Sequence, residues 1–229
     1  MNMNLGEEHV IMLEEKTEGW AAGLQLAVLS IQGKDIEARD RFLKDFRGTK
    51  TVIIEYLSEE IFGQLPEDIR HFLIQTSILD RFNSSLCDFI LGRNDSSEVI
   101  NKIYKSNIFI TLLDEQGQWF RYHALFRDIL KAGLVEEQGY VLHKKASNWF
   151  ENHELYEESI YHAIAAESFS DLERLLSKTA WTHIQRGEIK ALSAWIQVLP
   201  DERIDRNHEM KMYRAWCLLL TGNGKEAGE

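Results

Sequence analysis

The sequence has few of the residues that interrupt helices or cross-link a chain. Its 229 residues include 2 prolines, Pro66 and Pro200, and no stretch rich in glycine and serine. Because such residues end helices, their scarcity predicts a mostly helical chain. The 2 cysteines, Cys87 and Cys217, lie far apart and form no CxxC pair, so we expect a reduced, cytoplasmic protein without a disulfide framework.

Long apolar runs and an excess of basic charge are also missing. The first residues contain no basic cluster followed by an apolar stretch, so no signal peptide is expected. The longest apolar runs are 215–220 and 108–113, the second interrupted by Thr111, and both are far shorter than the roughly 18–20 residues that a membrane span needs. Acidic residues outnumber basic ones 37 to 26, for a net charge of −11. This balance disfavours contact with a phosphate backbone, so neither a membrane nor a nucleic acid is an expected partner.

Residues 5–31 are predicted to form two helices, separated at Thr17–Gly19. The second has the clearer apolar face. Trp20, Leu24, Val28 and Ile31 lie on one face of a helix. Gly23 lies inside this helix, where glycine costs about 1 kcal/mol relative to alanine. A glycine in such a place indicates the close approach of another backbone or of a ligand.

Residues 51–135 are predicted to form helices followed by a β-hairpin. One helix begins after Pro66, and its apolar face is predicted to contain Ile69, Phe72, Leu73 and Thr76. The serine pairs Ser84–Ser85 and Ser96–Ser97 are predicted to cap two of the helices. Two β-branched and aromatic runs, 108–113 and 119–122, flank a turn in which Gly117 supplies the left-handed position. A further helix follows the hairpin. This order of elements is typical of a winged helix.

Residues 136–229 return to a helical period. Leu142, Ala146, Trp149 and Phe150 keep the offsets of one helical face, and the pattern repeats from Tyr156 through Ile160. Two later stripes consist of Leu172, Leu175 and Leu176, and of Tyr213, Trp216, Cys217 and Leu220. Short helices with one apolar face each are typical of an α-solenoid of tetratricopeptide type. The last apolar helix is followed by a turn and only a few more residues, so we expect the repeat array to be truncated and the chain to be part of a longer protein.

Motifs of catalysis are missing from the sequence. It contains no GxxxxGK[ST] phosphate loop, GxGxxG, GxSxG or HExxH, so we do not expect an enzyme. His143, His153 and His162 are too far apart to share a helical turn, and no metal site is expected. A cluster of acidic residues is predicted to be a solvated helix face; it contains Glu151, Glu154, Glu157 and Glu158.

His123 is the residue with the clearest functional potential. It follows the second predicted strand and begins a helix. A side chain and free backbone N–H groups at such a junction are able to bind an anion. The alternative is a histidine that caps a buried helix end.

Four strings in the sequence carry a family resemblance. They are TEGWAAGLQLA at 17–27, QTSILDR at 75–81, WFRYHALF at 119–126 and WIQVLPDE at 195–202. Together and in this order they resemble the MalT-like, LuxR-type ATP-dependent transcriptional regulators of bacteria, which are signal-transduction ATPases with numerous domains. The resemblance runs from about Leu5 to Ala227.

The resemblance implies a mainly α chain in three parts. Residues 1–50 would end the helical lid of a nucleotide-binding module, 51–135 would form a winged helix with its β-hairpin, and 136–229 would begin a tetratricopeptide-like sensor region. The implied parent is a slow ATPase switch that uses ATP or ADP with Mg²⁺, senses a small-molecule inducer and binds DNA through a separate C-terminal domain. The implied partners of this segment are the upstream nucleotide-binding domain and the downstream repeats. The segment itself, which lacks the phosphate loop, is expected to hold no cofactor alone.

Three residues are implied to face the nucleotide in the intact parent. Gly23 and Gln25 lie in a string similar to the Gly-x-Pro-type motif of related apoptotic and plant-resistance ATPases, with Gln25 in place of proline. His123 lies in a string similar to their Met-His-Asp-Leu motif, whose histidine approaches the β-phosphate of ADP. Ala124 replaces the aspartate of that motif.

The expected function is therefore that of a regulatory segment of a MalT-like transcriptional activator. It would couple the nucleotide state to an inducer-sensing helical-repeat domain. The alternative is a scaffold of winged helix and repeats that binds a protein partner and has no nucleotide role. A phosphate loop upstream of Met1 would favour the first function.

Overall fold

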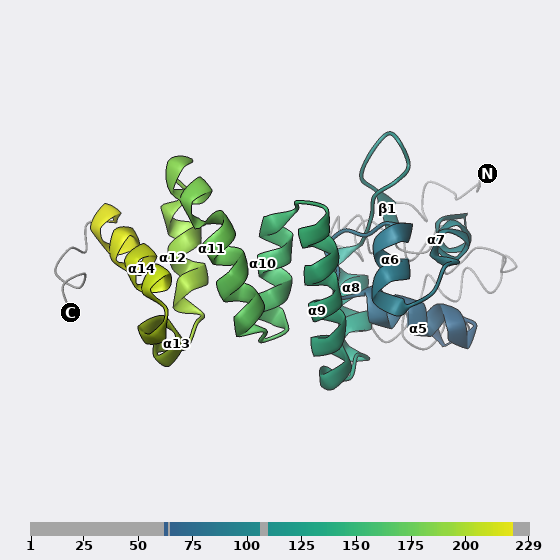
Figure 1. Ribbon diagram of the computed structural model, residues 1–229. Helices are drawn as coiled ribbons and strands as arrows, with labels where there is room; N and C mark the ends of the chain where they lie inside the picture. The colour runs from purple at the N-terminus through teal and green to yellow at the C-terminus, as the bar shows by residue number, and fades with distance from the viewer. Residues whose placement is uncertain (1–61, 64, 106–109, 222–229) are drawn as a thin grey trace, which may run out of the picture. The chain divides into compact units, whose positions relative to one another are not determined.

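The computed structural model describes residues 62–63, 65–105 and 110–221 (Figure 1). The predicted lid segment, with Gly23 and Gln25, lies outside these residues. The described residues divide into two compact units. The first contains the residues up to Arg81 together with Asn101–Gly133, and the second contains Phe82–Ile100 and the residues from Leu134 onward.

The first unit includes α5 (Glu67–Thr76), the end of α7 (Ser96–Lys105) and α8 (Ala124–Ala132). Pro66 directly precedes α5, and Glu67 and Asp68 occupy its first turn, where acidic side chains complement the positive end of the helix dipole. The buried face of α5 consists of Ile69, Phe72, Leu73 and Thr76. This face was predicted from the helical spacing of the same residues.

The β-hairpin of the first unit pairs β1 (Ile110–Leu112) with β2 (Phe120–Tyr122). The strands are antiparallel, with Ile110 opposite Tyr122 and Leu112 opposite Phe120. Gly117 has φ of 72°, which confirms that it supplies the left-handed turn position. Asp114 Oδ1 accepts hydrogen bonds from the backbone N–H groups of residues 118 and 119, at 2.8 and 3.1 Å, and so closes the turn.

The second unit is helical in all its described elements. It contains α6 (Ser84–Leu91), the first half of α7, α9 (Glu136–Asn152), α10 (Tyr156–Ala165), α11 (Phe169–Gln185), α12 (Ile189–Gln197), α13 (Asp201–Arg206) and α14 (His208–Leu220). The predicted serine cap of α6 is wrong, because the capping residue is Asn83. Its Oδ1 accepts a hydrogen bond from the backbone N–H of Leu86 at 2.8 Å. The serines at 84 and 85 are already helical.

Three successive turns between helices share one backbone geometry. Each contains a left-handed residue: Glu154 with φ of 59°, Glu167 with φ of 49° and Gly187 with φ of 75°. The next residue returns its backbone N–H to the carbonyl five positions earlier, as in the Schellman motif. The three bonds are Leu155 to Phe150 at 2.9 Å, Ser168 to Ala163 at 3.0 Å and Glu188 to His183 at 2.9 Å. These short turns make consecutive helices neighbours.

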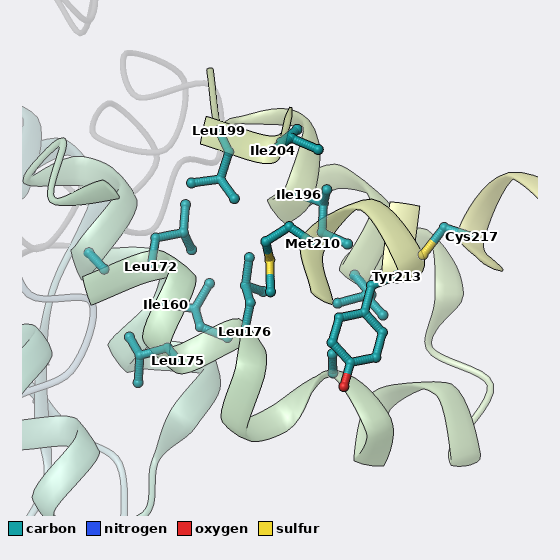
Figure 2. Close-up of a cluster of buried hydrophobic side chains, with 13 residues drawn as sticks. Ile160, Leu172, Leu175, Leu176, Ile196, Leu199, Ile204, Met210, Tyr213 and Cys217 are labelled. Carbon is teal, nitrogen blue, oxygen red and sulfur yellow. The ribbon is translucent and has the colours of Figure 1, made fainter. Parts of the chain in front are cut away.

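A hydrophobic core joins the helices from α10 to α14 (Figure 2). Ile160 and the leucines 172, 175 and 176 of α10 and α11 are fully buried, as the helical period predicted. Tyr213 and Cys217 of α14 are also buried, but Leu220, which shares their predicted stripe, is 60% exposed. The structure confirms the helices of this region, whereas their assignment to tetratricopeptide repeats stays a prediction. Within the described residues, no helix is long and apolar enough to cross a membrane.

Candidate functional site

The candidate site is the junction between β2 and α8, which His123 occupies alone. The strand ends at Tyr122 and the helix begins at Ala124. His123 has extended backbone angles (φ −59°, ψ 137°), and its carbonyl oxygen accepts the first helical hydrogen bond, from Arg127, at 3.0 Å. His123 is thus the N-cap residue of α8, as the alternative interpretation expected, although its side chain makes no capping hydrogen bond.

The imidazole of His123 instead contacts the neighbouring strand. Its Nε2 lies 3.2 Å from the hydroxyl of Thr111 on β1. Burial and the positive charge of Arg121 both lower the pKa of His123 from its usual value. At neutral pH the imidazole is therefore neutral, with one nitrogen as donor and the other as acceptor. A neutral imidazole can exchange its hydrogen bond with Thr111 for one to another group without a change in its own charge.

Tyr122 fixes the junction to α5. Its hydroxyl lies 2.7 Å from Thr76 Oγ1, a contact between residues 46 positions apart. Thr76 donates its single proton to the carbonyl oxygen of Phe72 at 2.6 Å, so the proton between the two hydroxyls belongs to Tyr122. The Tyr122 ring also meets Phe126 of α8 edge-on, at 6.1 Å between centroids. The residue before His123 is thus held against both α5 and α8.

Arg121 lies close enough to the junction for its charge to lower the pKa of His123, and two other arginines lie in the same unit. Arg121 is exposed on β2, and Arg127 on the second turn of α8 pairs with Asp80. Arg81 lies over the ring of Trp119, 4.7 Å from its centroid. The first turn of α8 adds backbone N–H groups, which have no partner inside a helix. Donors and positive charge together suit a bound anion.

Sequence reasoning missed two side-chain clusters of the second unit. His143 Nδ1 and His162 Nδ1 lie 2.7 Å apart, although the residues are 19 positions apart. They meet because α9 and α10 pack side by side, which spacing within one helix does not reveal.

Three further groups, Glu157, His183 and Glu188, also converge. The predicted solvated face is also more structured than expected, since Glu151 pairs with Arg174 and Lys178.

The described elements define a class of protein: a mainly α chain whose helices are interrupted by one β-hairpin, as in a winged helix. Residues 58–142 match the family described as MalT winged helix domain. This part of the chain is accordingly similar to the MalT winged helix domain, and the predicted fold class, mainly α with a winged helix, is confirmed. The matched family is a domain of a transcriptional regulator and not a catalytic domain.

Characterised relatives match most of the chain. It is 27% identical over 215 residues to the HTH-type transcriptional regulator MalT of Vibrio campbellii. The aligned region covers 93% of this chain and 24% of that protein. It is 28% identical over 206 residues to MalT of Yersinia enterocolitica, with 88% and 23% covered. It is also 27% identical over 221 residues to the serine/threonine-protein kinase PknK of Mycobacterium tuberculosis, with 95% and 20% covered. The chain thus spans about a quarter or less of these relatives.

Proposed function

We propose that this chain is the regulatory middle of a MalT-like, ATP-dependent transcriptional activator. In that protein it couples the nucleotide state of an upstream module to an inducer-sensing helical region. The observation that carries the proposal is the position of His123, half-buried between β2 and α8 inside the matched winged helix. In the proteins that the motif resembles, a histidine at this position approaches a phosphate of ADP.

The chemistry of the junction supports this assignment. A neutral His123 donates one N–H, the first turn of α8 offers backbone donors, and Arg121 adds positive charge. These groups fit the oxygen atoms of a diphosphate. Gly23 and Gln25 are proposed to face the nucleotide base from the lid segment. ATP or ADP with Mg²⁺ would be held by the upstream module, and the residues of this chain would only sense which nucleotide is there.

The range of relatives supports a regulatory role. Proteins named as a transcriptional regulator and as a protein kinase both match about nine-tenths of this chain. A segment shared by proteins with such different outputs is better suited to controlling an output than to producing one. DNA binding and any catalysis of the parent are accordingly assigned to its other domains.

A scaffold without a nucleotide role is the second candidate. It is favoured by exposed apolar side chains at the end of the helical region, where Trp181 is 51%, Leu219 58% and Leu220 60% exposed. Large exposed apolar groups are typical of protein-binding surfaces. In this case the partner would be another protein or further repeats of the parent.

Inducer-independent transcription distinguishes the two functions. In the full-length parent, a contact between His123 and ADP stabilises the resting state, because a ligand shifts an equilibrium only by binding one state better. His123→Leu should then raise transcription from a target promoter in the absence of inducer. A scaffold predicts unchanged basal transcription. The thermal stability of the variant must equal that of the wild type for either result to count.

A further inference from the structure

Three potential metal ligands converge in the second unit, well away in sequence from the winged-helix junction. They are Glu157 near the start of α10, His183 in the last turn of α11 and Glu188 just before α12. One ligand atom of each lies within 4.8 Å of the other two. Imidazole and carboxylate groups together suit divalent transition metals such as zinc.

The turn after α11 preorganises two of the three ligands. Gly187 takes the left-handed conformation with φ of 75°, and Glu188 returns its backbone N–H to the carbonyl oxygen of His183 at 2.9 Å. This Schellman turn brings the Glu188 side chain back to the imidazole, where Oε2 lies 2.6 Å from Nδ1 of His183. The imidazole is 4% exposed and packs edge-on against Trp195, 4.9 Å between centroids. Its orientation is therefore fixed.

Glu157 completes the set from a separate helix. It is the second residue of α10 and is exposed, so its side chain is free to change rotamer. Its carboxylate brings a second negative charge close to Glu188. Two neighbouring carboxylates repel each other, and a divalent cation between them removes that repulsion.

The spacing of the ligands fits a small cation. In a tetrahedral zinc site with bonds of about 2.0–2.2 Å, ligand atoms lie about 3.3–3.6 Å apart. The contact between His183 and Glu188 would open slightly, and the exposed Glu157 would move in. We propose that Glu157, His183 and Glu188 bind a divalent transition-metal ion, with water as the fourth ligand. Zinc is the ion used to test the site. The ion replaces the proton between His183 and Glu188, which leaves to solvent.

The bound ion would tie α10 to the turn between α11 and α12. A metal ion held by side chains from separate elements stabilises the folded state, because the unfolded chain does not bring those side chains together. The consequence is a metal-dependent stiffening of the helical region, independent of nucleotide binding at the winged helix.

Calorimetric titration of zinc into the chelator-treated full chain tests the proposal. We expect one zinc per chain, a higher unfolding temperature with zinc than with chelator, and an affinity loss on the order of tenfold or more in Glu157→Gln. His183→Gln should lose binding more completely. Glu137→Gln is the matched control, since Glu137 is likewise the exposed second residue of its helix, α9, and the substitution removes the same charge. It should bind zinc as the wild type does.

The histidine pair on α9 and α10 is the competing zinc site. His143→Gln removes one member of that pair and should leave zinc affinity unchanged. Loss of binding in His143→Gln with full binding in Glu157→Gln would overturn the proposal, as would the absence of any zinc binding by the wild-type chain. If His183→Gln fails to fold, the comparison of Glu157→Gln with Glu137→Gln decides the outcome, because both residues are exposed.

Discussion

The hydrogen bond between Tyr122 and Thr76 should be a measurable part of the stability of the first unit. Both residues are buried, with Tyr122 4% and Thr76 0% exposed. In Tyr122→Phe, Thr76 keeps its bond to the carbonyl oxygen of Phe72, and the hydrogen bond between the two hydroxyls is lost. We expect a cost of about 0.5–1.5 kcal/mol in the free energy of unfolding.

The reciprocal change, Thr76→Val, should cost more. It removes the oxygen that accepts from the Tyr122 hydroxyl, and the loss of a partner by a buried polar group costs about 1–3 kcal/mol. The double variant lacks both hydroxyls. It should therefore cost less than the sum of the two single changes, by on the order of 1 kcal/mol.

Hydrogen exchange of the backbone amides of α5 and β2 is the suitable assay, because it reports the stability of the unit that contains these elements. Tyr140→Phe is the control, since the Tyr140 hydroxyl makes an exposed hydrogen bond to Glu136. Its effect should stay within about 0.5 kcal/mol. Strictly additive costs for Tyr122→Phe and Thr76→Val would refute the proposed pairing of the two hydroxyls.

Two further predictions follow from backbone and charge. Glu154→Gly should raise the free energy of unfolding of the second unit by up to about 1 kcal/mol, measured in urea. The reason is that Glu154 has φ of 59°, which glycine adopts without steric cost. A lower free energy of unfolding would contradict this. The pKa of His123 is lower in the folded chain than in the unfolded chain, where it is near 6.5. As the pH falls below that value, the unfolded chain takes up a proton first, so stability should decline until the lower folded pKa is reached. His123→Gln should remove this decline between the two pKa values, and an unchanged pH profile would argue against it.

The sequence predicted those features that depend on local pattern. The buried face of α5 followed from the helical spacing of Ile69, Phe72, Leu73 and Thr76. The hairpin followed from β-branched and aromatic runs on either side of Gly117, whose positive φ the structure confirms. Periodicity and turn chemistry are properties of neighbouring residues, so a single sequence contains them.

One helix boundary and the contacts that depend on packing between elements were missed. Asn83 rather than a serine caps α6, because the helix begins one residue earlier than the serine pattern indicated. The contact of His143 with His162 depends on how α9 packs against α10, and the grouping of Glu157 with His183 and Glu188 depends on three elements. A signal was present for the last group, since Gly187 after the apolar stripe of α11 marks a helix end that turns Glu188 back toward His183.

The affinity of the intact parent for ADP tests the central claim most directly. The claim is that His123, which lies in the winged helix, contacts a phosphate of the bound nucleotide. One charge-assisted hydrogen bond contributes roughly 1.5–3 kcal/mol, so His123→Gln should weaken ADP binding by about ten- to a hundredfold in titration calorimetry. Thr111→Val, which removes only the partner of the imidazole on β1, should weaken it less. An unchanged dissociation constant in a folded His123→Gln variant would contradict the account and leave His123 as a packing residue.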